Sequence, residues 1–262
     1  MTPLLALVRK ELLVLFGSPV AYLTLALIGT VTALLFFDHL RIYNQILFLY
    51  TTTVMGGFDS GTIPDYVSVR DTVFLPVMEQ LALTLVGLVP LATMRVFAEE
   101  RLRGTDELLF TSRLSPAQIV AGKFLATYVF VALLLAVSFV YPATSVLRAG
   151  LGMEHLLAVY LGLFVLGLGL ASIGLACSAF TTSQLVAAVS AYAVAFVLYD
   201  FGWAFGFVGE PVAVVLDRLS LHPRFAGFAE GVVSLADLVY FAALSAACAI
   251  LARLSLDWLR IR

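Results

Sequence analysis

The sequence predicts an all-α protein that crosses a membrane several times, and two observations support this prediction. Of the 262 residues, 62% are hydrophobic and only 12% are charged, and the mean hydropathy is +1.05. Soluble domains average about 25% charged residues, so this chain has about half the charge that would cover a globule of its size. Several apolar segments are also long enough to cross a bilayer. A polytopic membrane protein is therefore expected, and a water-soluble enzyme is nearly excluded.

Six segments reach the ~20 apolar residues that a transmembrane helix needs. In chain order they are residues 20–37, 75–94, 119–141, 156–178, 185–206 and 234–254. No second domain or linker is evident, so residues 1–262 are expected to form a single transmembrane domain. The two halves do not repeat each other recognisably, which argues against a transporter built from inverted repeats.

A helix lying flat at the membrane interface is expected before the first span. Its polar residues are grouped at Arg9, Lys10 and Glu11 within an otherwise apolar stretch, a pattern typical of interfacial helices. Gly17 can end this helix, and Ser18-Pro19 can cap the next one. The apolar run that follows is too long for the core of a cleaved signal peptide.

The distribution of lysine and arginine predicts the orientation. Short segments before the first span, between spans two and three and after span six are rich in Lys and Arg, which is typical of cytoplasmic loops. The arginines of the opposite side are spread over longer stretches and mixed with acidic residues. Both termini are therefore expected in the cytoplasm, as an even number of spans requires.

A dense group of charges occupies the expected cytoplasmic loop between spans two and three. These residues are Arg95, Glu99, Glu100, Arg101, Arg103, Asp106, Glu107 and Arg113. Gly104 interrupts the group, and Thr105 can cap a short helix whose first turn carries Asp106 and Glu107. Orientation requires only basic residues, so the added acids favour a surface that binds another protein over an ordinary solvated loop.

The third span is expected to begin at a capping box. Ser115-Pro116-Ala117-Gln118 combines a serine N-cap, proline at the first helical position and glutamine at the third. The helix that it opens runs toward Pro142 and exceeds the ~30 Å hydrocarbon core, so Lys123 is expected at the inner interface.

Two acidic residues fall within predicted spans, Glu79 in the second and Asp200 in the fifth. Both are expected in the outer third of the membrane. Partial exposure at the outer interface is one interpretation, and the lining of a polar pathway is the other.

Small and aromatic residues make two further predictions. In the fourth span, Gly167/Ala171 and Gly174/Ser178 permit close helix approach, and packing within the monomer is favoured over a dimer face. Between residues 201 and 233, aromatic residues that include Phe225 and Phe228 are expected to anchor short helices at the outer interface.

The sequence gives no support for catalysis, metal binding or nucleic-acid binding. The three histidines are scattered, and Cys177 and Cys248 lie in apolar runs. There is no His-Glu-x-x-His motif and no phosphate-binding loop ending in Gly-Lys-Ser/Thr. The formal charge of −2 provides no basic field for nucleic acid. The chain is thus expected to bind no cofactor, and any energy must come from another protein.

Three blocks of residues resemble one family, the type-2 ABC transporter permeases, and most closely their gliding-motility-associated (Gld-type) branch. The first block joins Val8-Arg9-Lys10-Glu11-Leu12 to Ser18-Pro19-Val20-Ala21-Tyr22. The second comprises Met94-Arg95, Phe97-Ala98-Glu99-Glu100, Gly104-Thr105, Glu107-Leu108-Leu109, Thr111-Ser112 and Gly122-Lys123-Phe124. The third runs from Leu219 to Phe241. Arg113 departs from the pattern, because relatives usually have proline there.

The resemblance implies six spans, short re-entrant helices on the outer side before span six, and a cytoplasmic coupling helix between spans two and three. The residues implied to contact the ATPase are Arg95, Glu99, Glu100, Gly104, Thr105 and Glu107. Two ATP-binding subunits, which hold ATP and Mg, and a second permease subunit are implied partners, with an accessory extracytoplasmic protein possible in addition. The implied location is the cytoplasmic (inner) membrane of a bacterium, in contact with membrane lipid.

Three functions stay open at this point. The leading one is the permease subunit of an ATP-driven transporter, with export favoured because the family mostly exports. A secondary transporter or channel that needs no ATPase is the second. The third is a membrane scaffold for a cell-surface or motility machine.

Overall fold

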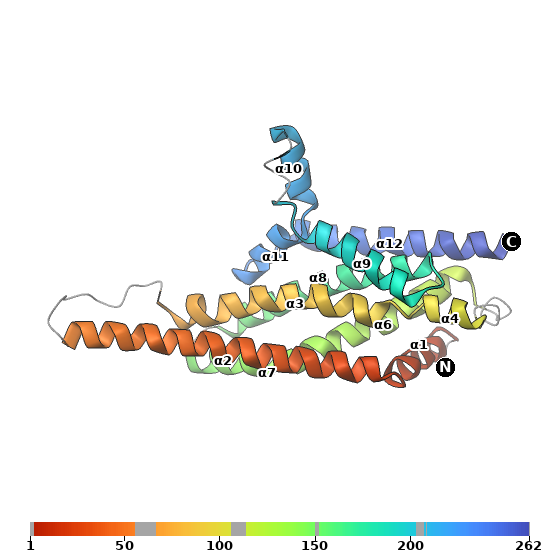
Figure 1. Cartoon of the computed structure of the whole chain (residues 1–262). Helices are drawn as coiled ribbons and strands as arrows, with labels where there is room; N and C mark the ends of the chain where they lie inside the picture. The colour runs from red at the N-terminus through yellow and green to blue at the C-terminus, as the bar shows by residue number, and fades with distance from the viewer. Residues whose placement is uncertain are drawn as a thin grey trace.

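The computed structural model describes residues 3–55, 67–105, 114–149, 152–202, 207 and 209–261, and the secondary structure of these residues is helical. Figure 1 shows long helices that run side by side, with one short helix standing away from them. The elements are α1 (Pro3–Phe16), α2 (Pro19–Met55), the π-helical turn η1 (Arg70–Phe74), α3 (Leu75–Thr93), α4 (Ala98–Arg103), α6 (Pro116–Ser138), α7 (Val140–Ala149), α8 (Met153–Ala179), α9 (Gln184–Tyr199), α10 (Glu210–Leu219), α11 (Leu221–Ala229) and α12 (Leu235–Ile261).

Within the described ranges, five helical segments are long and apolar enough to cross a membrane: Pro19–Thr52, Arg70–Arg103, Pro116–Ser138, Met153–Ala179 and Leu235–Trp258. They correspond to five of the six predicted spans. The fifth predicted span is represented by α9, which has 16 residues and is about 24 Å long, less than the ~30 Å hydrocarbon core. It ends at Tyr199, before the expected boundary at 206, because the backbone at Asp200 is extended. The count of six spans therefore stays a prediction.

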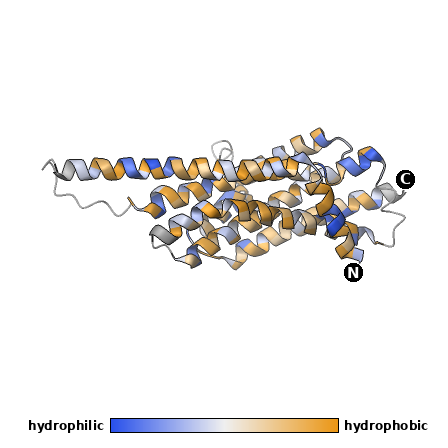
Figure 2. Cartoon of the chain, turned by 90° about the horizontal axis from the view of Figure 1, so that it is seen from below, coloured by the Kyte–Doolittle hydropathy of each residue, from blue (hydrophilic) through white to orange (hydrophobic). Residues whose placement is uncertain are grey.

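The first long helix extends far beyond its predicted span. α2 has 37 residues and is about 55 Å long, whereas the apolar criterion ended the span at residue 37. Figure 2 shows polar residues concentrated on the projecting half of α2. A helix needs apolar residues only where it crosses lipid, so hydropathy locates the end of a span and not the end of the helix.

Both termini lie at the same end of the bundle as α4 (Figure 1). We call this the α4 end. The projecting half of α2 and the start of α3 lie at the other end, which we call the opposite end. The predicted helix boundaries at the α4 end are confirmed. α1 stops before Gly17, Ser18 Oγ accepts a hydrogen bond from Val20 N, and the capping box at Ser115 is formed with Gln118.

Glycines on α8 allow neighbouring elements to approach its backbone. A Cβ placed on Gly162 would lie 2.4 Å from Phe228 Cβ, and one on Gly167 would lie 2.6 Å from Val131 Cγ1. At Gly174 the corresponding atom would lie 2.0 Å from Thr93 Oγ1. These small residues therefore pack against α11, α6 and α3 of the same chain, which confirms the prediction of packing within the monomer.

Two short helices precede α12, as expected, but their environments differ. α10 has no buried residues and stands away from the bundle (Figure 1). Phe225 and Phe228 of α11 are both 0% exposed. The prediction that these two residues anchor the chain at the outer interface is therefore wrong, because the space beside Gly162 admits α11 into the core. The re-entrant character of both helices stays a prediction.

Candidate functional site

The short helix α4 is attached at its start to a serine of α8. At its start, Ser178 Oγ accepts hydrogen bonds from the backbone N–H groups of Phe97 and Ala98, at 3.1 and 3.0 Å, and donates one to Met94 O. These contacts supply acceptors for N–H groups that have none within the helix. α4 is therefore held against the end of α8.

α4 ends at Gly104, whose φ of 65° is left-handed. The N–H of Gly104 then bonds to Arg101 O and that of Thr105 to Glu100 O, an arrangement that glycine adopts without steric cost. The predicted break at Gly104 is confirmed. Thr105 Oγ1 donates back to Glu100 O at 3.3 Å. The helix that Thr105 was expected to cap, with Glu107, lies outside the described residues.

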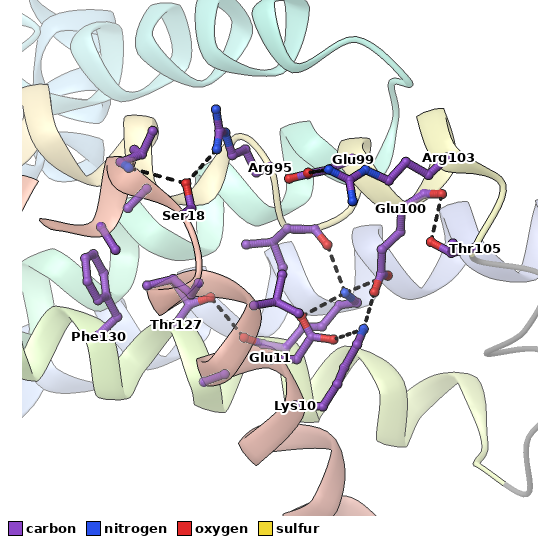
Figure 3. A pocket seen from close by; sticks show the side chains of 18 residues that line it. Lys10, Glu11, Ser18, Arg95, Glu99, Glu100, Arg103, Thr105, Thr127 and Phe130 are labelled. Carbon is purple, nitrogen blue, oxygen red and sulfur yellow. Dashed lines mark hydrogen bonds and ion pairs between the residues drawn. The ribbon is translucent and has the colours of Figure 1, made fainter. Parts of the chain in front are cut away.

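Four charged side chains from three helices form what we call the buried ion cluster: Lys10, Glu11, Glu100 and Lys123. The side chain of Lys123 is 0% exposed, and its Nζ lies 2.7 Å from Glu100 Oε2 and 3.1 Å from Glu11 Oε2. Lys10 pairs with Glu11 at 2.9 Å and also with Glu100 (Figure 3). The cluster thus joins α4 to both α1 and α6.

Each charged group of the buried ion cluster has a partner of opposite charge. Lys123 Nζ also donates to Val96 O at 2.8 Å, so this ammonium group has three acceptors. Two carboxylates balance two ammonium groups, which is the condition under which buried charges are tolerated. Partial burial by itself lowers the pKa of Lys10, but the hydrogen bonds and charges of Glu100 and Glu11 outweigh it, so this pKa is raised above its usual value.

A cavity of about 350 Å³ lies beside the buried ion cluster. Charged groups and apolar side chains contribute to different parts of its wall (Figure 3). The lining residues are Lys10, Glu11, Val14, Leu15, Ser18, Val20, Ala21, Ala92, Arg95, Val96, Glu99, Glu100, Arg103, Thr105, Lys123, Ala126, Thr127 and Phe130.

The remaining predicted residues of this segment have distinct surroundings. Arg95 Nη1 donates to Ser18 Oγ, in the turn between α1 and α2, at 2.6 Å. Glu99 pairs with Arg103 across one helical turn at 2.6 Å, and the Arg103 side chain is largely exposed. The structure therefore brings Arg95, Glu99, Glu100, Arg103 and Thr105 around one cavity at the α4 end.

Glu79 and Asp200 do not belong to this site. Both are exposed. Asp200 Oδ1 accepts a hydrogen bond from Gly202 N at 2.7 Å. Asp200 follows the last residue of α9 and Glu79 lies near the start of α3, away from α4.

The buried ion pair of Glu11 with Lys123 was not predicted from the sequence. Glu11 was assigned to the polar strip of an interfacial helix, yet it is 7% exposed. Its partner Lys123 is 112 residues away in the chain. The available signal was chemical: a lone lysine in an apolar helix and a glutamate in another each require a partner of opposite charge.

These features define a class, the multi-pass α-helical membrane proteins, with a charged segment fixed at one end of the bundle. The sequence profile of one family, described as ABC-2 family transporter protein, matches residues 77–211. That match covers just over half of the chain, from α3 to the first turn of α10. The chain belongs to this family. No curated protein matches the chain significantly.

Membership of the family makes the chain a permease subunit of an ABC transporter. Permease domains of this family are membrane components without an ATPase motif of their own, and they associate with an ATP-binding subunit. The segment from Met94 to Thr105 lies inside the matched region.

Proposed function

We propose that this chain is the membrane-spanning half of an ATP-driven exporter and that α4 transmits the motion of the ATPase to the bundle. Two copies of a separate ATP-binding subunit, holding ATP and Mg, supply the energy. Family membership supports the association with an ATPase. The direction of transport and the number of subunits are part of the proposal.

The observation that carries the proposal is the buried ion cluster. Glu100 on α4 binds Lys123 on α6, and Lys123 binds Glu11 on α1. A displacement of α4 therefore pulls on two other helices instead of bending a free loop. When nucleotide binding closes the ATPase dimer, pressure on α4 would rock the permease halves as rigid bodies.

The proposed topology has six passes with both termini in the cytoplasm of a bacterium. Its support is geometric: both termini lie at the α4 end (Figure 1), and a chain that ends where it began has crossed the bundle an even number of times. Five long segments and the shorter α9 make that even number. We place the α4 end at the cytoplasmic face because lysine and arginine are concentrated in its short connections.

The assembly proposed around this chain includes a second permease subunit and an accessory extracytoplasmic protein. The resemblance to the gliding-motility-associated branch supports a role in motility or cell-surface export. Glu79 and Asp200 are proposed as pathway-lining residues because both are exposed acidic residues within predicted spans.

The first test is purification of the chain from native membranes in mild detergent, followed by mass spectrometry of the proteins that accompany it. A stoichiometric ATP-binding subunit is expected. A chain that purifies alone in several gentle detergents would contradict the proposal and favour a secondary transporter or channel. ATP hydrolysis that responds to a candidate substrate would distinguish a transporter from a scaffold.

Two substitutions distinguish binding of the ATPase subunit from transmission of its motion through α4. Glu99→Lys changes a partly exposed residue whose ion pair lies within α4, so it should lower the yield of the ATPase subunit without affecting membrane insertion. Glu100→Gln should preserve that yield and abolish the difference in ATP hydrolysis between the ATPase alone and the complex. Glu154→Gln, an exposed change at the start of α8, is the matched control. Unchanged yield and hydrolysis in both test variants would refute the coupling role of α4.

A further inference from the structure

We propose that the cavity beside α4 binds an anionic phospholipid, with the phosphate on Arg95 and the start of an acyl chain on the apolar wall. The proposal concerns a ligand of the permease chain itself. It does not depend on the ATPase partner or on the direction of transport, and it rests on the charges, the hydrogen bonds and the wall of the cavity.

The cavity is lined by one more basic side chain than acidic side chains. Four basic and three acidic side chains line it. Glu11 and Glu100 are bound by Lys10 and Lys123, and Glu99 is bound by Arg103. Among the described residues, Arg95 is the lining cation that forms no ion pair with a carboxylate. The cavity therefore carries a net positive charge located at Arg95.

The guanidinium group of Arg95 is also incompletely hydrogen-bonded. Its Nη1 donates to Ser18 Oγ at 2.6 Å. Its Nε is buried and has no acceptor within the described part of the chain. A buried N–H without an acceptor is costly, and a phosphate oxygen is an acceptor well matched to the arginine fork. Figure 3 shows Arg95 beside Ser18, apart from the contact between Lys10 and Glu100.

The rest of the wall suits a hydrocarbon chain. Val14, Leu15, Ala21, Ala92 and Phe130 supply an apolar surface, and the volume of about 350 Å³ lies in the range of small-molecule sites. Val14 is 55% exposed, so the apolar wall continues to the outer surface of α1. Because α1 is expected at the membrane interface, an acyl chain can leave the cavity along this helix and enter the leaflet.

A cavity that combines an unpaired arginine with an apolar wall favours an amphiphile over a free ion. A phosphate alone would satisfy Arg95 but leave the apolar wall uncovered, and a lipid without a phosphate would cover the wall but leave the buried N–H without a charged acceptor. An anionic phospholipid meets both requirements. Bound there, it would bridge the turn between α1 and α2 and the segment that leads into α4.

The test is titration of the purified full-length chain in neutral detergent, followed by native mass spectrometry. The probes are dioctanoyl phosphatidylglycerol, dioctanoyl phosphatidylcholine and inorganic phosphate. Phosphatidylglycerol should bind at least about tenfold more tightly than phosphatidylcholine, because the choline cation cancels the net charge of phosphatidylcholine and is repelled by the positive charge of the cavity. Equal binding of the two lipids would overturn the proposal. Binding of phosphate as tight as that of phosphatidylglycerol would reduce the site to one for a free anion.

Variants locate the binding within the cavity. Arg95→Ala should weaken phosphatidylglycerol binding about tenfold. Arg95→Lys keeps the positive charge but loses the forked guanidinium group, so its affinity should lie between those of the wild-type chain and Arg95→Ala. Ala92→Phe fills the space beside the apolar wall and should weaken phosphatidylglycerol binding, although Arg95 is unchanged. The matched control is Arg253→Ala, which removes one positive charge from α12, outside this cavity. A loss in the control equal to that in Arg95→Ala would show non-specific attraction and overturn the assignment.

Discussion

The two ends of the bundle differ in how their charged residues are connected. At the α4 end, ion pairs connect residues that are far apart in the chain, such as Lys123 and Glu11, and bury them. At the opposite end, Asp200 bonds to a residue two positions away and Glu79 is exposed. A cluster of four charged residues therefore joins three helices at the α4 end, whereas the ion pair of Arg224 with Asp237 joins only α11 to α12 and, among the described residues, Glu79 and Asp200 form no such cluster. The difference indicates that a displacement of one helix can be transmitted to other helices at the α4 end.

The largest effect is expected at Lys123. Lys123→Met leaves the carboxylates of Glu100 and Glu11 buried without their main partner, and breaking a buried pair in this way costs about 3–5 kcal/mol of unfolding free energy. Denaturant unfolding of the wild-type chain and the variant in mild detergent measures this loss of unfolding free energy. The triple variant Lys123→Met/Glu11→Gln/Glu100→Gln removes all three charges and should recover most of the loss. A single variant as stable as wild type would show that the cluster does not join the helices.

Close packing at α8 gives the next effect. Gly167→Ala places a Cβ 2.6 Å from Val131 Cγ1, and such overpacking costs about 1–3 kcal/mol. Adding Val131→Ala removes the opposing methyl group and should restore part of the stability. Gly87→Ala is the matched control, because a Cβ there has no neighbour within 4 Å. Equal unfolding free energies for Gly167→Ala and Gly87→Ala would contradict the close approach of α6 and α8.

Removal of the hydroxyl that holds α4 should have an intermediate effect. Ser178→Ala deprives the N–H groups of Phe97 and Ala98 of their acceptor, at a cost of about 1–2 kcal/mol. Hydrogen exchange of these amides should accelerate. Ser190→Ala, whose hydroxyl bonds to carbonyls of its own helix, should leave exchange in α4 unchanged. Faster exchange in both variants alike would indicate a general loosening of the bundle.

A smaller effect is expected for Lys10, whose side chain is 44% exposed. Lys10→Met should cost about 1 kcal/mol or less, because solvent screens the pair. The raised pKa of Lys10 means that its contribution is complete below the usual lysine pKa of about 10.4 and is lost only as pH rises through the higher folded value. The difference between wild type and variant should thus be constant from about pH 6 to pH 9. A difference that changed within this interval would assign the effect to another group.

The smallest effect is expected at the opposite end. Glu79→Gln alters an exposed side chain and should change the unfolding free energy by less than about 0.5 kcal/mol. The same measurement on Glu100→Gln provides the comparison, since both variants replace a glutamate by its isosteric amide. A loss at Glu79 as large as that at Glu100 would remove the contrast between the two ends.

Local sequence signals predicted the helix boundaries near α4 well. The break at Gly17, the capping box at Ser115 and the left-handed glycine at Gly104 all depend on interactions between residues a few positions apart. Apolar length found five of the long helices. It misplaced the end of α2 and the end of α9, because a helix can continue in water and can also stop before the apolar residues do.

The sequence by itself determined that the chain is a helical membrane protein and that its charges gather between the second and third spans. Composition and short-range patterns suffice for this, because lipid and backbone hydrogen bonding act on every residue locally. Only the tertiary structure decided that Glu100 would meet Lys123 and Glu11, that Arg95 would line a cavity, and that Phe225 and Phe228 would enter the core. These outcomes depend on which helices become neighbours, and side-chain packing across the whole bundle sets that choice.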